Sequence, residues 1–237
     1  MAPRYLAPFA EGGSAPIGED ECQRLLNLAM AGGADYADLY FEYSVSGSYG
    51  YDEGILKSAG RYVSMGLGVR VMKGDATGYA YVQDFSPEGM AHAAKTAAQI
   101  ASAGGAPDPV GLKSVSIPSR YPVEMLSLDA EGIDKRALLQ CADEAARAAD
   151  SRIVRVNASL SEELREILVA TSTGRFVRDR QPLIRFGVSA VAEDGDKRQS
   201  GSSGGGGRFG LDYFESHSPE HHAAEATRQA LAMLDAR

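Results

Sequence analysis

The segment His217–His221 has the residue types and spacing that come closest to a metal-binding site. It reads His-Ser-Pro-Glu-His, and within one helix this spacing places two imidazoles on a single face for zinc, with the glutamate as general base. Pro219 argues against such a site, because proline belongs in the first turn of a helix and leaves His217 outside it. The segment therefore predicts a helix start, with no catalytic and no metal-binding residue. His222 and His92 are expected at the surface.

The second candidate site is the glycine-rich segment Gly201–Gly210, which we expect to form a loop. It contains four consecutive glycines, Gly204, Gly205, Gly206 and Gly207, followed by Arg208. A phosphate-binding loop has lysine and a hydroxyl residue where Arg208 and Phe209 stand here, so the pattern does not favour nucleotide binding. A run of glycines can let another segment or an extended peptide lie against bare backbone. Plain flexibility of the loop is the alternative.

Composition and charge narrow the class of protein. The chain has 237 residues and a net charge of −8, which argues against the basic face that nucleic-acid binding requires. No stretch approaches the ~18 apolar residues of a membrane span, and no apolar segment typical of a signal peptide follows the N-terminus. Two cysteines are too few for a disulfide framework. We expect a soluble, cytoplasmic protein that contacts neither membrane nor nucleic acid.

The helices and strands that must position these residues are expected to form an α+β fold, with antiparallel sheets flanked by helices. Helices are expected over 19–31, 86–103 and 129–150, and from 219 to the C-terminus. Helical spacing places Cys22, Leu25, Leu26 and Ala29 on one apolar face of the first helix. It places Ile133, Leu138, Cys141, Ala145 and Ala148 on one apolar face of the third helix. Alternating polarity and short turns predict strands over 37–44, 55–58, 65–72, 77–83, 152–160, 166–172, 176–180, 183–193 and 196–201.

The order helix, strands, helix occurs twice along the chain, which favours an internal duplication. Gly68-Val69-Arg70-Val71 also resembles Gly187-Val188-Ser189-Ala190. Two α+β layers that converge on similar turn signals are the alternative. Residues 1–18, rich in proline, glycine and alanine, predict an N-terminal arm. Residues 19–237 predict one domain, with halves 19–103 and 129–237 joined by an extended segment over 104–128.

Several of these segments, in this order, resemble the N-terminal region of the TldD/PmbA family, metallopeptidases historically called modulators of DNA gyrase. They are Asp35–Glu42, Glu53–Ser58, Gly66–Arg70, Thr77–Tyr81, Arg185–Ser189 and Gly201–Gly210. The resemblance covers about residues 20–237. The Ala-Asp-Leu-Tyr-Phe-Glu strand and the Gly-Gly-Gly-Gly-Arg-Phe-Gly segment together favour the TldD side of the family over the PmbA side.

The resemblance implies a zinc metallopeptidase that degrades unstructured peptides in an enclosed cavity, as a homodimer or as a heterodimer with a PmbA-type subunit. The family binds zinc through an H-E-x-x-x-H helix and a distant cysteine, which nothing in this chain matches. We therefore expect the zinc of the full-length protein to bind beyond Arg237, and none to be bound by this chain. No effect on DNA gyrase is indicated by the sequence.

By that likeness, residues 19–237 enclose the substrate and take part in the dimer contact. An extended peptide can be held as an added strand at a sheet edge, and Gly204–Gly207 are the preferred place, with Arg208 available to a carboxylate or a carbonyl. Two alternatives remain: a non-catalytic, PmbA-like partner or scaffold subunit, and a stand-alone anion-binding module built on the glycine segment.

Overall fold

The computed structural model describes residues 5–101, 111–118 and 122–236. The parts of the predicted arm and of the predicted segment 104–128 that fall at 1–4, 104–110 and 119–121 lie outside these ranges. The helices are α1 (Glu19–Met30), α2 (Pro87–Ala101), α3 (Gly132–Ala149), α4 (Tyr213–Ser216) and α5 (Pro219–Asp235), with a short 3-10 turn at Ser127–Asp129. The strands are β1 (Tyr36–Asp52), β2 (Ile55–Lys73), β3 (Ala76–Val82), β4 (Lys113–Ser114), β5 (Ile153–Thr171), β6 (Arg175–Asp194) and β7 (Lys197–Gly207).

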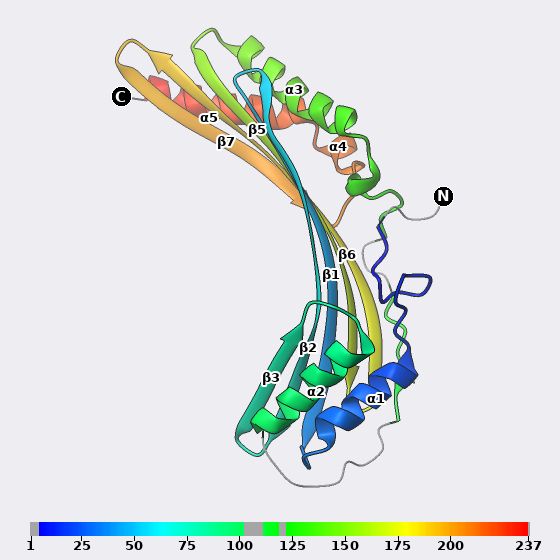
Figure 1. Cartoon of the computed structure of the whole chain (residues 1–237). Helices are drawn as coiled ribbons and strands as arrows, with labels where there is room; N and C mark the ends of the chain where they lie inside the picture. The colour runs from blue at the N-terminus through cyan, green and yellow to red at the C-terminus, as the bar shows by residue number, and fades with distance from the viewer. Residues whose placement is uncertain (1–4, 102–110, 119–121, 237) are drawn as a thin grey trace. The chain divides into compact units, whose positions relative to one another are not determined.

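The strands form one seven-stranded sheet in the order β3-β2-β1-β5-β6-β4, with β7 also paired to β6. The β2–β3 and β6–β7 pairs are antiparallel, and the two residues of β4 pair parallel to β6. The long elements repeat as helix, three strands, helix, first α1-β1-β2-β3-α2 and then α3-β5-β6-β7-α5 (Figure 1). The predicted fold class, antiparallel strands flanked by helices, is confirmed. Within the described ranges, no helix combines the length and apolar character needed to cross a membrane.

Three strands, β2, β5 and β6, each join two predicted strands into one, and β1 and β7 extend beyond their predicted ends. In β5 the polar stretch after Leu160 looks like a break, but the burial alternation continues through Glu162, Leu164 and Glu166. In β6 the break was expected near Pro182. That residue lies between the stretch paired with β4 and the stretch paired with β7, where one side of β6 has no partner strand, as a proline in a strand requires.

By its internal contacts the chain divides into two units, each discontinuous in sequence. Unit 1 contains residues 1–45, 63–120 and 165–180. Its core has three mutually packed rings, Phe9, Phe41 and Phe85, with centroids 5.5 to 6.0 Å apart. The predicted apolar face of α1 is confirmed, since all four of its residues are buried.

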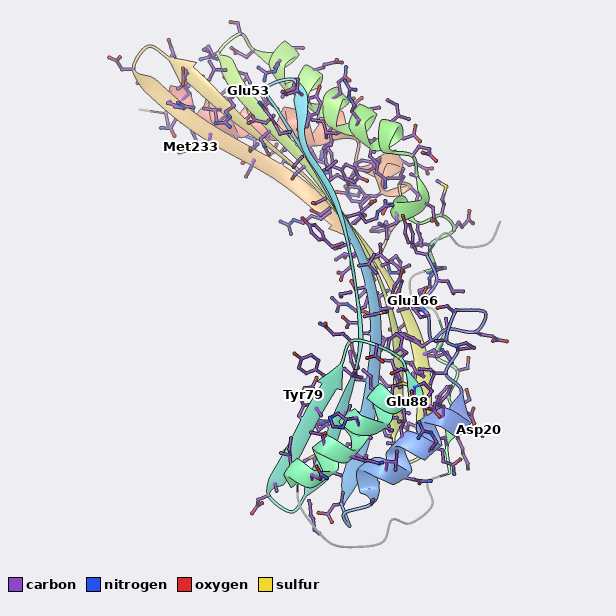
Figure 2. The ribbon with its side chains drawn as sticks, viewed as in Figure 1. Asp20, Glu53, Tyr79, Glu88, Glu166 and Met233 are labelled. Atoms are coloured by element: carbon purple, nitrogen blue, oxygen red, sulfur yellow. The ribbon has the colours of Figure 1, made fainter. Side chains whose placement is uncertain are left out.

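Residues 5–18, within the expected arm, form no helix or strand, yet they are anchored in unit 1. Phe9 and Ile17 are buried in its core. The backbone N–H of Ala7 donates at 3.1 Å to the carboxylate of Glu166, a residue labelled in Figure 2. Arg178 donates to the carbonyl of Phe9 at 3.2 Å. The segment therefore packs as part of the unit.

Unit 2 contains residues 46–62, 121–164 and 181–237, and in it α3 and α5 cover one face of β5, β6 and β7 (Figure 1). The predicted apolar face of α3 is wrong. Ile133 is 67% exposed, whereas Lys135 is fully buried and lies on the packed face with Leu139, Ala142 and Ala146. A buried lysine broke the apolar pattern on which the prediction rested.

Lys135 is buried because it pairs with an equally buried carboxylate. Its Nζ lies 2.7 Å from Oε1 of Glu162 and 5.2 Å from the centre of the Tyr49 ring. The guanidinium of Arg61 is 3.8 Å from the same carboxylate oxygen. Gly47 makes room for the pair, since a Cβ there would lie 2.6 Å from Glu162 Oε1. This cluster joins α3 to the sheet.

We expect Lys135→Met to lower the free energy of unfolding by about 3–5 kcal/mol, because it leaves the carboxylate of Glu162 buried without its closest partner. The double variant Lys135→Met/Glu162→Leu should recover most of that loss, because no uncompensated charge remains. Urea unfolding of the three proteins measures both effects. A single variant as stable as the unaltered chain would contradict the assignment.

Candidate functional site

The candidate site is a groove of about 680 Å³ on the face of β5, β6 and β7 that α3 and α5 leave uncovered. Besides Leu183 and Arg185, the residues that point outward there are small, so the floor of the groove is low. The small residues are Asn157 and Ser159 of β5, Gly187 and Ser189 of β6, and Ser202 and Gly204 of β7. Gly187 pairs directly with Gly204, so no side chain rises between the two strands at that point.

The predicted glycine loop is wrong in its conformation, because Gly201–Gly207 belong to β7. Gly204, Gly205, Gly206 and Gly207 pair in antiparallel register with Gly187, Phe186, Arg185 and Ile184. Glycine is unfavourable in a strand for reasons of entropy, so these positions need a structural reason. The reason is the close approach of neighbouring atoms on both faces of β7.

On the covered face, helix α5 and Tyr213 lie directly against the strand. A Cβ at Gly201 would lie under 3.0 Å from the backbone of Ala226 and Ala230. A Cβ at Gly205 would lie under 3.0 Å from the hydroxyl oxygen of Tyr213. A side chain at position 205 would therefore point into the protein interior and not into the groove.

On the groove face, the close neighbour is the backbone of β6. A Cβ at Gly204 would lie 2.6 Å from the carbonyl oxygen of Phe186, and a Cβ at Gly206 would lie under 3.0 Å from that of Ile184. Any larger residue at either position would push β7 away from β6. Gly207, at the end of the strand, is packed against the ring of Phe209.

The outer edge of β7 carries backbone groups that no described strand pairs with. The N–H of Ser202 donates to Oε1 of Gln229 at 3.4 Å, so it points away from β6. Along an antiparallel strand these directions repeat every two residues. The N–H and C=O groups of Gly204 and Gly206 therefore also point outward. Such an edge is a template for another extended chain.

Charge in the groove is limited to one residue of the described lining, Arg185 of β6. Arg208, which the sequence analysis assigned to substrate, follows the last residue of β7 and donates to Oε1 of Gln181 at 3.3 Å. The structure thus brings Gly204 and Gly206 to an open edge, turns Gly205 inward, and places Arg208 beyond the strand end. Sequence reasoning did not single out Arg185 as a site residue.

His222 is 4% exposed, so the prediction that it lies at the surface is wrong. Its Nδ1 lies 3.0 Å from Oγ of Ser203 in β7, and its Nε2 lies 2.9 Å from the hydroxyl of Tyr213. Burial, followed by the nearby His221 and His217, lowers the pKa of its imidazole below 6.5. The ring links helix α5 to the strand that forms the outer edge.

The segment His217–His221 forms a helix start, as predicted. Pro219 occupies the first turn of α5, and the Ser218 side chain accepts the backbone N–H of His221 at 3.2 Å. His217 stands before the helix with its ring stacked on Tyr213, and Glu220 accepts a hydrogen bond from the thiol of Cys141. These side chains do not fit a zinc site, and no other described residues form a group of three metal ligands.

We expect Gly205→Ala to destabilise the chain by roughly 1–3 kcal/mol, because the new methyl group meets the Tyr213 hydroxyl, which His222 holds in place. The same substitution in a Tyr213→Phe background should cost less, since the clashing oxygen is gone. Denaturant unfolding of the four proteins gives this coupling directly. Equal costs in the two backgrounds would contradict the contact.

The lowered pKa of His222 predicts a loss of stability in acid. The folded chain favours neutral imidazole, so the contribution is present above about pH 6.5, the pKa of an ordinary histidine. It is lost as the pH falls below that value, where the unfolded chain binds the proton more tightly. His222→Gln should flatten the unfolding free energy between pH 7 and 5, and the control His92→Gln, at an exposed histidine of α2, should not. An unchanged slope in His222→Gln would overturn this assignment.

Comparisons with known proteins agree with this fold. The model of the PmbA/TldA metallopeptidase domain 1 matches residues 37–101, and that of the central domain of the same metallopeptidases matches residues 127–234. A metalloprotease TldD homologue from Haemophilus influenzae is 38% identical over 214 residues, which is 85% of this chain and 43% of that protein. One from Buchnera aphidicola of Acyrthosiphon pisum is 33% identical, over 86% and 44%. The chain thus spans less than half the length of these curated relatives.

Solved structures of similar fold cover nearly the whole chain. A Thermotoga maritima protein that carries the name modulator of a DNA gyrase has a TM-score of 0.73 at 20% identity, over 92% of this chain and 49% of its own. TldE from Thermococcus kodakarensis has a TM-score of 0.66 at 18% identity, over 90% and 47%. At these identities the likeness concerns the fold, and the family follows from the sequence matches. The chain belongs to the PmbA/TldD family of metallopeptidases.

Proposed function

We propose that this chain holds the substrate of a TldD-like metallopeptidase that cleaves unstructured peptides. The peptide lies extended and adds as a further strand to the outer edge of β7. The unpaired, outward-pointing backbone groups of Gly204 and Gly206 carry this proposal. Recognition through backbone hydrogen bonds is largely independent of sequence, which suits an enzyme that acts on many unfolded segments.

The groove supports this assignment because it leaves room for peptide side chains. On a strand added to β7, every second side chain projects to the same face as Gly204 and Gly206. Apart from Leu183 and Arg185, that face is lined by glycine, serine and asparagine, so side chains of very different size can be accommodated. The inward face of β7 is closed by α5 and Tyr213, which leaves the groove face and the outer edge for substrate.

In this proposal, the residues that bind the catalytic metal lie outside this chain. The name metalloprotease, which the relatives carry, implies a metal, but the described histidines and carboxylates do not fit one. We place the zinc-binding H-E-x-x-x-H helix beyond Arg237, and we propose that residues 19–237 enclose substrate and contribute to contact with a second TldD- or PmbA-type subunit. A native reading frame that ends at Arg237 would instead favour the stand-alone binding module. One that continues without that motif would favour the PmbA-like partner.

The name modulator of DNA gyrase is not carried over to this chain. Its net charge of −8 gives no basis for the phosphate contacts that direct DNA binding needs.

A scan of N-methylated peptides tests the added strand directly. We expect a labelled, unstructured peptide to bind the chain in fluorescence anisotropy, and a scrambled peptide of equal composition to bind with similar affinity. Methylation of single backbone amides should weaken binding by about tenfold or more at alternate positions only, because only every second N–H faces β7. Equal effects at every position would contradict strand addition.

Two matched protein variants test whether the peptide lies on the groove side of β7. Ser202→Tyr introduces a ring among the lining residues, whereas Ser200→Tyr introduces the same ring on the same face of the strand outside the groove. Only Ser202→Tyr should weaken binding. Equal affinities of the two variants would locate the peptide elsewhere.

A further inference from the structure

We propose that Arg185 binds a carboxylate of the peptide in the groove, so that the site prefers acidic substrates. The inference rests on the proposed function, since a peptide must first pair with β7. Arg185 is exposed on β6 and is the one charged residue of the described groove lining. The described groove lining thus carries one positive charge and no acidic residue, although the net charge of the whole chain is −8.

Arg185 forms no hydrogen bond or ion pair with any described residue, in contrast to other arginines of unit 2. Arg155 pairs with Asp52, Arg198 pairs with Glu193, and Arg208 donates to Gln181. These partners engage the guanidinium groups of Arg155, Arg198 and Arg208. The guanidinium of Arg185 keeps all of its donors for a ligand, and guanidinium donors match the two oxygens of a carboxylate.

The glycines of β7 open the path from Arg185 to the peptide. Arg185 pairs across the sheet with Gly206, and the next outward residues along β7 and β6 are Gly204 and Gly187. No side chain therefore rises between Arg185 and the outer edge of β7. With adjacent strands about 4.8 Å apart, a long arginine side chain can lean over Gly206 toward a strand added at that edge.

The register identifies which part of the peptide is involved. The peptide residue directly opposite Gly206 projects its side chain to the groove face, because residues in a cross-strand pair share one face. An aspartate or glutamate at that position brings its carboxylate toward Arg185. The C-terminal carboxylate of a peptide that ends there offers the same chemistry, so both sources are included in the test.

The test compares two labelled peptides that differ only by glutamate or glutamine at one position, each with an amidated and a carboxylate C-terminus. Fluorescence anisotropy at low salt gives the dissociation constants for the unaltered chain, for Arg185→Gln and for Arg198→Gln. Arg198→Gln is the matched control, because it removes the same charge from the neighbouring strand outside the groove. We expect the unaltered chain and Arg198→Gln to bind the carboxylate form roughly three- to tenfold more tightly, and Arg185→Gln to bind both forms equally.

The outcomes separate this inference from the proposed function. If all forms bind the unaltered chain equally, the preference is refuted while strand addition stands. A preference that persists in Arg185→Gln, or that Arg198→Gln also abolishes, refutes the role of Arg185. Binding that responds to C-terminal amidation but not to glutamate supports the inference with the terminus as source. If no peptide binds, the proposed function fails, and this inference fails with it.

Discussion

The close approach of β7 to its neighbours is the constraint on which the candidate site depends. Helix α5 and Tyr213 lie against one face of the strand and the β6 backbone crowds the other, so Gly201, Gly204, Gly205 and Gly206 have no room for a side chain. Van der Waals contacts with these neighbours stabilise β7 as a strand, although glycine has a poor strand propensity. The same absence of side chains lowers the floor of the groove and leaves the outer edge of β7 accessible.

Much of this architecture could be predicted from local signals, and the errors have physical causes. The helix starts at Ser86 and Ser218 and the buried face of α1 depend on neighbouring residues alone, so the sequence reveals them. The buried face of α3 depends on an ion pair between Lys135 and Glu162, residues far apart in the chain. The glycine run was mistaken for a loop because its partners, Tyr213 and the β6 backbone, approach it only in the folded chain.

Unit 1 contains the same packing of a helix on a glycine-bearing strand. In β3, a Cβ at Gly78 would lie under 3.0 Å from the backbone of Ala97 and Ala101 in α2, as one at Gly201 would from Ala226 and Ala230 in α5. Each contact involves the last long strand and the last long helix of one repeat of the element order. Together with the Gly-Val echo in β2 and β6, this supports duplication of one ancestral unit.

The two repeats differ at the proposed binding position. In β2, Gly68 pairs with Tyr81 and lies beneath Tyr79, whose hydroxyl oxygen would be 2.7 Å from a Cβ there. In β6, the matching Gly187 pairs with Gly204, and the one described side chain near its Cβ position is Ser159, whose Oγ would be 3.4 Å away. One repeat thus fills with tyrosine the space that the other leaves open. Both repeats keep the same helix contact, so the element order itself is compatible with side chains on the outward face of the last long strand. The proposed addition of an extended peptide to β7 would account for the difference.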